Sequence, residues 1–234
     1  MRRKAKEMGI AIESSVSDGN QVEAGAPIAV IAGTPKQVSM AEDCLIGLIA
    51  KTSGIATAAR RAVILSRTRI RVVSGGWKKV PYQMKEEVRE AIRIGGAGVR
   101  LVDAPFVYLD KNYVRMFGSV SEAVRSASSF EGRVRAVQIR GETREISEEA
   151  IEAAEAGAGI VMVDTGNSVD LEAVSDALRK AGLRRSVKIA FGGSIGMDDI
   201  PGFIDRDVDI LDVGRSIIDA PMLDIGLDVR TAMK

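Results

Sequence analysis

Two stretches near the end of the chain decide the fold: VKIAFGGSIG at residues 187–196 and VDILDVGRS at residues 208–216. Each begins with a mainly apolar run, typical of a strand buried on both faces, and continues into glycine and other small residues. Two consecutive strand–turn–helix units of this kind predict a parallel sheet or an α/β barrel. Adjacent late strands of a barrel end at one part of its rim, so two helix N-termini would present backbone N–H groups there.

The two turns therefore predict a phosphate site and make a phosphorylated small molecule the first ligand to consider. The site would be formed by Gly192, Gly193, Ser194, Gly214 and Arg215. These glycines have a second explanation, because a tight turn needs glycine wherever φ is positive. The repetition of the pattern one unit later favours the phosphate interpretation.

The composition narrows the class of protein. The 234 residues can form one barrel or two modest domains, and 33 Lys and Arg balance 32 Asp and Glu. This balance and an aromatic content of only 4% argue against a nucleic-acid partner. No apolar run reaches the roughly 18 residues of a membrane helix, so we expect no membrane partner. The single Cys44 fits a reducing compartment, and we expect a cytoplasmic protein.

The chain contains no histidine. This absence excludes a Ser-His-Asp or Cys-His nucleophile and any imidazole ligand to zinc. Proton transfer would fall to Asp, Glu, Lys or Tyr, or the reaction would need little of it.

Apolar periodicity divides the chain into a small β-rich unit, a barrel and a tail, which we place at residues 1–39, 40–225 and 226–234. In the first unit we expect strands over residues 13–16 and 28–31. The barrel part opens with a helical stripe interrupted at Thr52-Ser53-Gly54. Strands are then predicted over residues 69–73, 106–109, 133–139, 160–163, 187–191 and 208–213, with helices over 82–94, 119–126, 147–156 and 169–181.

Polar residues after two of these strands are further candidates. Asp164 follows the strand 160–163, where it could accept hydrogen bonds from ribose hydroxyls or hold magnesium, or instead cap the next helix. Lys78 follows a glycine-rich turn and could pair with a phosphate or diphosphate, although an exposed surface lysine is the alternative.

Three arginines, Arg67, Arg69 and Arg71, alternate along a predicted strand. They would share one face, which is either exposed to solvent or forms a second anion site.

Several motifs together resemble one enzyme family. AEDCLIGLIAKTSGIAT at residues 41–57 resembles A-E-R-T-A-L-N-F-L-Q-R-L-S-G-I-A-T of quinolinate phosphoribosyltransferases, also called carboxylating nicotinate-nucleotide pyrophosphorylases. Residues 16–25 are similar to V-x-D-G-x-x-V-x-x-G, residues 160–164 to I-I-M-L-D, and residues 192–195 to the S-G-G-I phosphate turn. Residues 208–214 and 220–228 resemble G-V-D-V-I-S-V-G and A-P-x-L-D-I-S-L-D. These matches follow the family's order over most of the chain.

The resemblance implies an open, TIM-like parallel α/β barrel of the type II phosphoribosyltransferase kind, with a small and here shortened N-terminal domain. It implies a homodimer or higher homo-oligomer whose sites use both subunits. It also implies a pyridine-nucleotide biosynthetic enzyme that joins a nitrogen base to phosphoribosyl diphosphate, with magnesium on the diphosphate. On this chain Asp164 would then be catalytic, holding ribose or metal, and Lys78 would hold the diphosphate.

The family residues that grip the two carboxylates of quinolinate are altered here. The arginine of A-E-R-T is Asp43, and the arginine of T-R-K-T-T-P aligns with Trp77, beside Lys78. For N-H-R only Arg100 is available, in a shifted register. The lysine of L-I-K-D-N-H aligns with Asp110 unless Lys111 replaces it, and the glutamate of V-E-V-E aligns with Gln138 or Arg140.

We therefore expect the phosphoribosyl half of the site to be retained and quinolinate to be a poor substrate. The base would be bound by Trp77, Asp43, Lys111, Arg100 and Gln138, with Trp77 offering an aromatic face. Each charge reversal would cost about 1–3 kcal/mol of dicarboxylate binding. Two alternatives stay open: a basic pocket rebuilt by Arg69, Arg71, Arg100 and Lys111, and a non-catalytic protein that binds a nucleotide or sugar phosphate.

Overall fold

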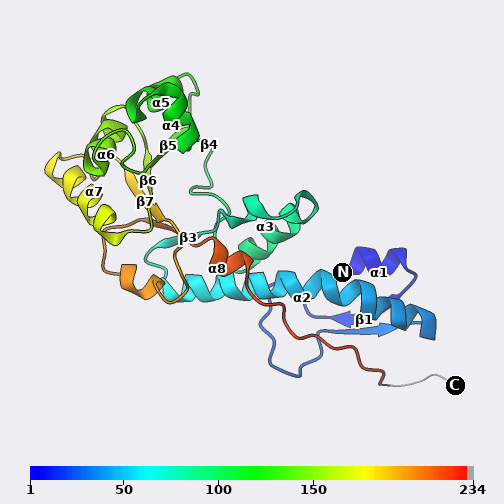
Figure 1. The fold of residues 1–234 in the computed structure, drawn as a ribbon. Coiled ribbons are helices and arrows are strands. Elements are labelled where there is room, and N and C mark those ends of the chain that lie inside the picture. The colour runs from blue at the N-terminus through cyan, green and yellow to red at the C-terminus, as the bar shows by residue number, and fades with distance from the viewer. Residues whose placement is uncertain (231–234) are drawn as a thin grey trace.

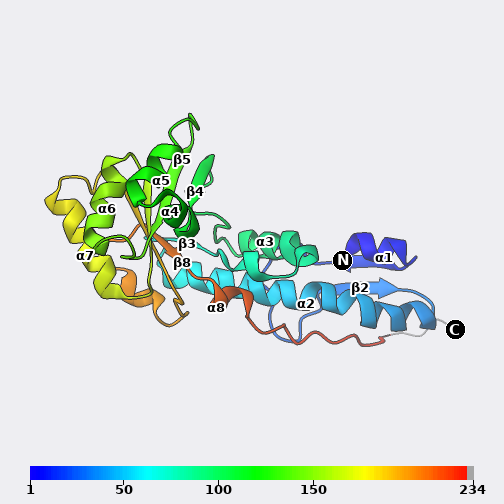
Figure 2. The same cartoon turned by 45° about the horizontal axis from the view of Figure 1, so that its top comes forward.

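A computed structural model describes residues 1–230 and shows two parts connected by one long helix (Figures 1 and 2). The smaller part contains helix α1 (Arg2–Glu7) and the antiparallel strands β1 (Ala11–Ser15) and β2 (Ala29–Ala32). Ala5 and Ile10 of this part pack against the long helix. The two strands expected in the N-terminal unit are present, and Ala5 and Ile10 of this unit are buried against that helix.

The long helix α2 (Pro35–Leu65) begins at a capping box. The Thr34 side chain accepts the N–H of Gln37, and the Gln37 side chain accepts the N–H of Thr34 at 2.8 Å. Pro35, which has no N–H, occupies the first helical position. The domain boundary expected between residues 39 and 40 lies inside this helix.

The interruption predicted at Thr52-Ser53-Gly54 is wrong, because α2 runs through it without a break. Gly54 instead allows another segment to come close. A Cβ at Gly54 would lie 2.0 Å from the carbonyl oxygen of Pro221, and the N–H of Leu223 donates to the carbonyl of Ala50. Glycine at position 54 therefore does not end the helix but leaves room for the backbone around Pro221.

Six strands form one parallel sheet in the order β3-β8-β7-β6-β5-β4. Strands β4 to β8 neighbour one another in chain order, and β3 lies beside β8, as in a barrel left open between β3 and β4. The predicted open α/β barrel is confirmed. The strands are β3 (Arg71–Val73), β4 (Phe106–Leu109), β5 (Val134–Ile139), β6 (Ile160–Asp164), β7 (Lys188–Gly192) and β8 (Ile210–Asp212).

Helices α4 to α7 cover the outer face of this sheet, and α3 lies beside α2 (Figure 1). Helix α4 was not expected from the sequence. It is short because Asp110 caps it, accepting the N–H groups of Asn112 and Tyr113, and Gly118 ends it in the left-handed region. The helices are α3 (Lys85–Ile94), α4 (Lys111–Phe117), α5 (Val120–Ser126), α6 (Ile146–Glu155), α7 (Ser168–Lys180) and α8 (Arg215–Ile218).

Apolar side chains pack on both faces of the sheet, as the apolar strand runs predicted. A larger cluster lies between the sheet and the helices. A smaller cluster fills the barrel interior and includes Val73, Ala136, Met162, Ala190 and Ile210. Side chains alternate along a strand, so these residues identify which positions of each strand point inward. None of the helices within residues 1–230 has the length and apolar character to cross a membrane.

Two expectations about connecting segments are wrong. Strand β3 begins only at Arg71, and Arg67 has a φ of 51° in a turn, so Arg67, Arg69 and Arg71 do not lie along one strand. Strand β7 leads through a turn to the 3₁₀ helix η3 (Ile200–Phe203), and α8 after β8 is a single turn. The predicted phosphate site therefore has a backbone turn after β7 and, after β8, the start of a helix of only one turn.

Candidate active site at the mouth of the barrel

Five neighbouring strands end in a ring of inward-pointing positions at the mouth of the barrel. Each position follows an inner-core residue of its strand by two, so alternation turns it inward. The ring, called the mouth ring below, consists of Tyr108, Gln138, Asp164, Gly192 and Asp212. It lies at the C-terminal ends of the strands, where barrels carry their active sites. Sequence reasoning missed Tyr108 and Asp212, although their alternation with Phe106 and Ile210 could have revealed them.

Asp164 and Gln138 form a hydrogen-bonded pair within the ring. The Gln138 amide donates to Oδ2 of Asp164, and its oxygen accepts the backbone N–H of Lys111 at 2.8 Å. Asp164 does not cap the next helix, because Asn167 does so by accepting the N–H of Val169 at 3.1 Å. Among the hydrogen bonds within residues 1–230, none reaches Oδ1 of Asp164, so this atom is available to a ligand.

Asp212 closes the ring next to β3. Its Oδ1 accepts the N–H of Gly75 at 2.8 Å. Burial raises the pKa of Asp212, and the Gly75 N–H together with Lys78 acts in the opposite direction. Burial, followed by the nearby charge of Asp164, also raises the pKa of Tyr108, so its phenol stays protonated and can donate a hydrogen bond.

Lys78 is brought to the mouth by the 3₁₀ helix η1 (Gly76–Lys79), which follows β3. Its ammonium lies 4.9 Å from the centre of the Tyr108 ring. The side chain is otherwise exposed. Lys78 is therefore placed to pair with an anion that enters the mouth.

The turns that follow β7 and β8 meet beside the mouth ring. The Ser216 hydroxyl donates to the carbonyl of Ile195 at 3.2 Å, which ties the two turns together. Among the hydrogen bonds formed within residues 1–230, none uses the backbone N–H of Gly193, Ser194 or Gly214. Neighbouring free N–H groups of this kind are typical of anion-binding concavities. Arg215 is exposed in the second turn.

Glycine is also required here for a structural reason. Gly193 has a φ of 108°, and a Cβ on it would lie 2.4 Å from the nitrogen of Gly166. A Cβ on Gly166 would lie 2.1 Å from the oxygen of Gly193. The tight-turn explanation therefore accounts for Gly193, and the free N–H groups are an additional property of the same turn.

Three other predicted site residues lie elsewhere or are already engaged. The indole N–H of Trp77 donates to the carbonyl of Val99 at 3.0 Å, and the Arg89 guanidinium lies 3.7 Å from its ring centre. Neither the N–H nor that ring face is free for a ligand. Arg100 is exposed beyond β3, and Asp43 is exposed on the first part of α2, which packs against the N-terminal unit (Figure 1).

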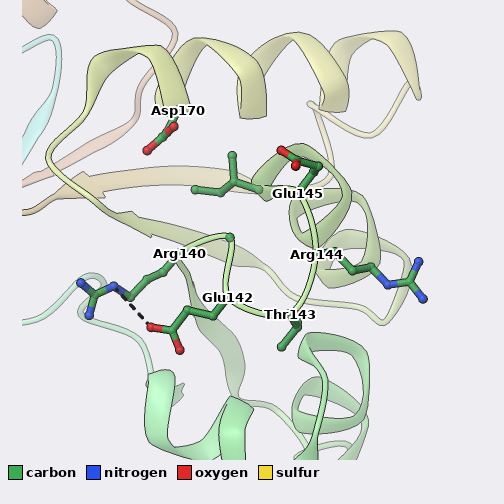
Figure 3. Close-up of a pocket in the computed structure, with 8 residues that line it drawn as sticks. Arg140, Glu142, Thr143, Arg144, Glu145 and Asp170 are labelled. Atoms are coloured by element: carbon green, nitrogen blue, oxygen red, sulfur yellow. Dashed lines mark ion pairs between the residues drawn. The ribbon is translucent and has the colours of Figure 1, made fainter.

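A hollow opens near the ring and is lined by residues 140–146 and Asp170 (Figure 3). The buried Glu149 holds its loop, accepting the N–H groups of Arg140, Gly141 and Thr143 at 2.7–3.0 Å. The loop that lines the hollow is thus held by Glu149, a buried carboxylate that the sequence analysis did not identify.

The arginines around this hollow pair with carboxylates of the protein itself, Arg115 and Arg140 with Glu142 and Arg144 with Glu152. Figure 3 shows Arg140 and Glu142 pointing toward one another and Arg144 pointing away. Arg115 makes two hydrogen bonds of 2.8 Å to Glu142, which lower the pKa of Glu142. Lys111 lies close enough to act in the same direction.

Comparisons with known proteins agree with this architecture. Over residues 55–228 the chain matches the model described as "Quinolinate phosphoribosyl transferase, C-terminal domain". It is 27% identical to the probable nicotinate-nucleotide pyrophosphorylase [carboxylating] of Methanothermobacter thermautotrophicus, covering 97% of this chain and 81% of the relative. It is 28% identical to the human nicotinate-nucleotide pyrophosphorylase [carboxylating], over 90% of this chain and 70% of that protein.

Solved structures share the fold. NadC from Streptococcus pyogenes superposes with a TM-score of 0.79 at 22% identity, over 95% of this chain and 77% of that one. The nicotinate-nucleotide pyrophosphorylase of Ehrlichia chaffeensis gives a TM-score of 0.83 at 16% identity, over 98% and 81%. The matched residues 55–228 include all six barrel strands and every residue of the mouth ring. The chain therefore belongs to the quinolinate phosphoribosyl transferase family.

Proposed function

We propose that this protein transfers the 5-phosphoribosyl group of phosphoribosyl diphosphate to a nitrogen base other than quinolinate. One observation carries the proposal: within residues 1–230 the N–H groups of Gly193, Ser194 and Gly214 are unbonded, and their turns follow β7 and β8, next in the sheet to β6 and β5, which end at the paired Asp164 and Gln138. Backbone N–H groups suit a phosphate dianion, and a carboxylate suits ribose hydroxyls. The family, and relatives named as nicotinate-nucleotide pyrophosphorylases, support a phosphoribosyltransferase-type reaction.

The side chains at the mouth suit this chemistry. As the diphosphate leaves, positive charge develops on the ribosyl ring, and the Asp164 carboxylate would stabilise it. Lys78 would pair with the departing diphosphate as a point charge. Neither role requires a histidine, which the chain lacks.

Magnesium is part of the proposal, and Asp164 fits it. Within residues 1–230 no three Asp, Glu, Cys or His side chains gather as a metal group. Mg²⁺ commonly binds one or two carboxylates together with substrate phosphates and water, so Asp164 with its free Oδ1 would be sufficient. When bound, the ion would neutralise charge on the diphosphate.

The charges at the mouth argue against quinolinate as the base. The family pattern I-I-M-L-D shares Asp164, but the ring also contains Asp212, whose carboxylate would repel a dicarboxylate by about 1–3 kcal/mol in a partly desolvated site. Two arginines considered for a rebuilt pocket are paired elsewhere. Arg71 contacts Asp103 at 2.7 Å, and Arg69 contacts Asp205 at 3.5 Å.

We also propose that the protein works as a homodimer or higher homo-oligomer in the cytoplasm. Helix α2 exposes Met40, Leu48 and Ile64. Exposed apolar side chains along one helix suit a contact with a second copy. The reducing cytoplasm fits the single, unpaired Cys44.

Release of inorganic pyrophosphate tests the function. The protein is incubated with phosphoribosyl diphosphate, Mg²⁺ and a panel of nitrogen bases, and products are identified by mass spectrometry. We expect pyrophosphate and a ribosylated base with at least one acceptor, and none with quinolinate. Nicotinate mononucleotide formed from quinolinate would show that the pocket is basic after all. Binding of ribose 5-phosphate without any turnover would instead identify a non-catalytic binding protein.

A further inference from the structure

One carboxylate at the mouth has no role in the transfer described above. Asp212 points into the barrel, and within residues 1–230 only its Oδ1 is hydrogen-bonded, to the N–H of Gly75. The side chain is only partly covered by protein, so Oδ2 can be reached from the mouth. Residues 208–214 resemble the pattern G-V-D-V-I-S-V-G, in which serine and not aspartate stands at this position.

The backbone around Asp212 leaves room for this carboxylate. A Cβ on Gly75 would lie 2.9 Å from Oδ2 of Asp212, and a Cβ on Gly192 would lie 3.2 Å from the Asp212 Cβ. Glycine on both sides therefore makes the space that the side chain fills. A carboxylate held through one oxygen, with the other free, has a fixed direction in which to accept a proton.

The charged and titratable groups that face Asp212 come from three elements. They are Lys78 and Lys79 of η1 and Asp164 of β6, and the neutral phenol of Tyr108 of β4 is the further titratable group. Burial is the strongest influence and raises the pKa of Asp212, while the two lysines oppose it. A carboxylate with a raised pKa holds a proton more tightly than an ordinary aspartate does, and is therefore the better base.

We infer that Asp212 is a general base and that the accepting nitrogen carries a hydrogen, as in an azole, a purine or another N–H heterocycle. The inference rests on the proposed phosphoribosyl transfer. The nitrogen attacks C1 of the ribosyl group while the bond from C1 to the diphosphate oxygen breaks, and diphosphate leaves with that electron pair. The N–H proton passes to Oδ2 of Asp212, which becomes a carboxylic acid. A pyridine nitrogen has no proton to give and would need no such base.

The test compares the wild-type protein with Asp212→Asn and with a control, Asp219→Asn. The asparagine oxygen can still accept the Gly75 N–H, so the loop keeps its contact, and Asp219 is an exposed aspartate after α8. Pyrophosphate release is followed with benzimidazole and adenine as N–H acceptors and with nicotinate and quinolinate as pyridine acceptors. Binding of phosphoribosyl diphosphate is measured separately by calorimetry.

We expect turnover with an N–H acceptor and none with the pyridines. Asp212→Asn should lower kcat by about 10²–10⁴-fold with little change in the affinity for phosphoribosyl diphosphate, and Asp219→Asn should match the wild type. The wild-type rate should rise with pH through an ionisation above the ordinary aspartate range, and Asp212→Asn should lack that rise.

Two results would overturn the inference and leave phosphoribosyl transfer standing: turnover confined to pyridine acceptors, or Asp212→Asn with the rate and pH profile of the wild type. Failure to bind phosphoribosyl diphosphate, or binding without turnover of any acceptor, would overturn the inference and the proposed function together.

Discussion

At the scale of single residues, two glycines of the proposed phosphate site differ in what the backbone demands of them. Gly193 has a φ of 108° and would press a Cβ to within 2.4 Å of the Gly166 nitrogen. Gly214 has a φ of −80°, and a Cβ on it would lie 3.9 Å from its nearest neighbour. A side chain at Gly193 therefore disturbs the fold, whereas one at Gly214 does not.

We expect Gly193→Ala to lower the free energy of unfolding by about 2–4 kcal/mol, through backbone strain and the clash with Gly166. Gly214→Ala should stay within about 0.5 kcal/mol of the wild type. Urea unfolding followed by circular dichroism measures both variants. Equal midpoints for the two would contradict the difference in backbone geometry.

Gly214→Asp separates binding from folding. A carboxylate at this turn would stand close to the free N–H groups and repel a phosphate. We expect calorimetry to show at least tenfold weaker binding of ribose 5-phosphate at an unchanged urea midpoint. Unchanged affinity would remove Gly214 from the phosphate site.

The candidate site could be predicted in part. Asp164 and Lys78 were found because each follows a buried strand or its turn, and position after a strand is visible in the sequence. Asp212 was missed because it lies within an apolar strand pattern. The contacts of Trp77 with the Val99 carbonyl and the Arg89 guanidinium could not be predicted, because both depend on how different segments of the chain pack.

At the scale of elements, α2 offers a matched pair of glycines. A Cβ added at Gly54 would lie 2.0 Å from the carbonyl oxygen of Pro221, whereas a Cβ added at Gly47 would have nothing within 4 Å. Alanine favours a helix interior over glycine by about 1 kcal/mol. We expect Gly47→Ala to stabilise the protein by up to that amount and Gly54→Ala to destabilise it by displacing the segment around Pro221. Thermal unfolding measures both, and stabilisation by Gly54→Ala would exclude this contact.

Helix α7 is tied to the loop before β8 through Asp207. This carboxylate accepts hydrogen bonds from Ser175 at 2.6 Å, from Arg179 at 2.9 Å and from Arg184 at 2.7 and 2.9 Å. Burial alone would raise the pKa of Asp207, but the hydrogen bonds from Arg184 and Ser175 outweigh burial and lower it to about 2.

A lowered pKa stabilises the fold above the unfolded-state pKa of about 3.9, and this contribution disappears as the pH falls toward 2. We expect Asp207→Asn to cost about 1–3 kcal/mol at pH 7, with the difference from wild type shrinking between pH 4 and pH 2. The exposed Asp205, changed to Asn, is the control and should leave the urea midpoint unchanged. A pH-independent effect of Asp207→Asn would contradict this role.

Most helices and strands were predictable from the sequence, and each failure has an identifiable cause. Every barrel strand was expected to within a few residues, because buried parallel strands appear as apolar runs. Helix α4 was not expected, although the Asp110 cap and Gly118 that bound it are both visible in the sequence. The false break in α2 arose because Gly54 was judged by its helix propensity, whereas a long-range contact explains it.

At the scale of the whole molecule, the strand order was predictable because alternating strands and helices admit few arrangements. The sequence could not show that the N-terminal unit packs against the far end of α2. Figure 2 shows α2 extending from the barrel to β1 and β2. This arrangement depends on packing between Ala41 and Leu45 of α2 and the first ten residues, and no local sequence pattern reveals that contact.

The exposed apolar side chains of α2 lead to a prediction about assembly. We expect a homodimer by sedimentation at micromolar concentration, because α2 exposes Leu48 and Ile64 to solvent in a single chain. Leu48→Lys should shift the protein toward monomer while retaining its circular dichroism spectrum. A wild-type monomer under these conditions would contradict the proposal.

A crystal soaked with phosphoribosyl diphosphate tests the central claim most directly, because it shows where the ligand's phosphate lies. The account predicts the 5-phosphate on the N–H groups of Gly193 or Ser194 and of Gly214 or Arg215, with the ribose hydroxyls at Asp164. A phosphate bound instead in the hollow lined by Arg140 and Arg144, with the mouth of the barrel empty, would contradict it.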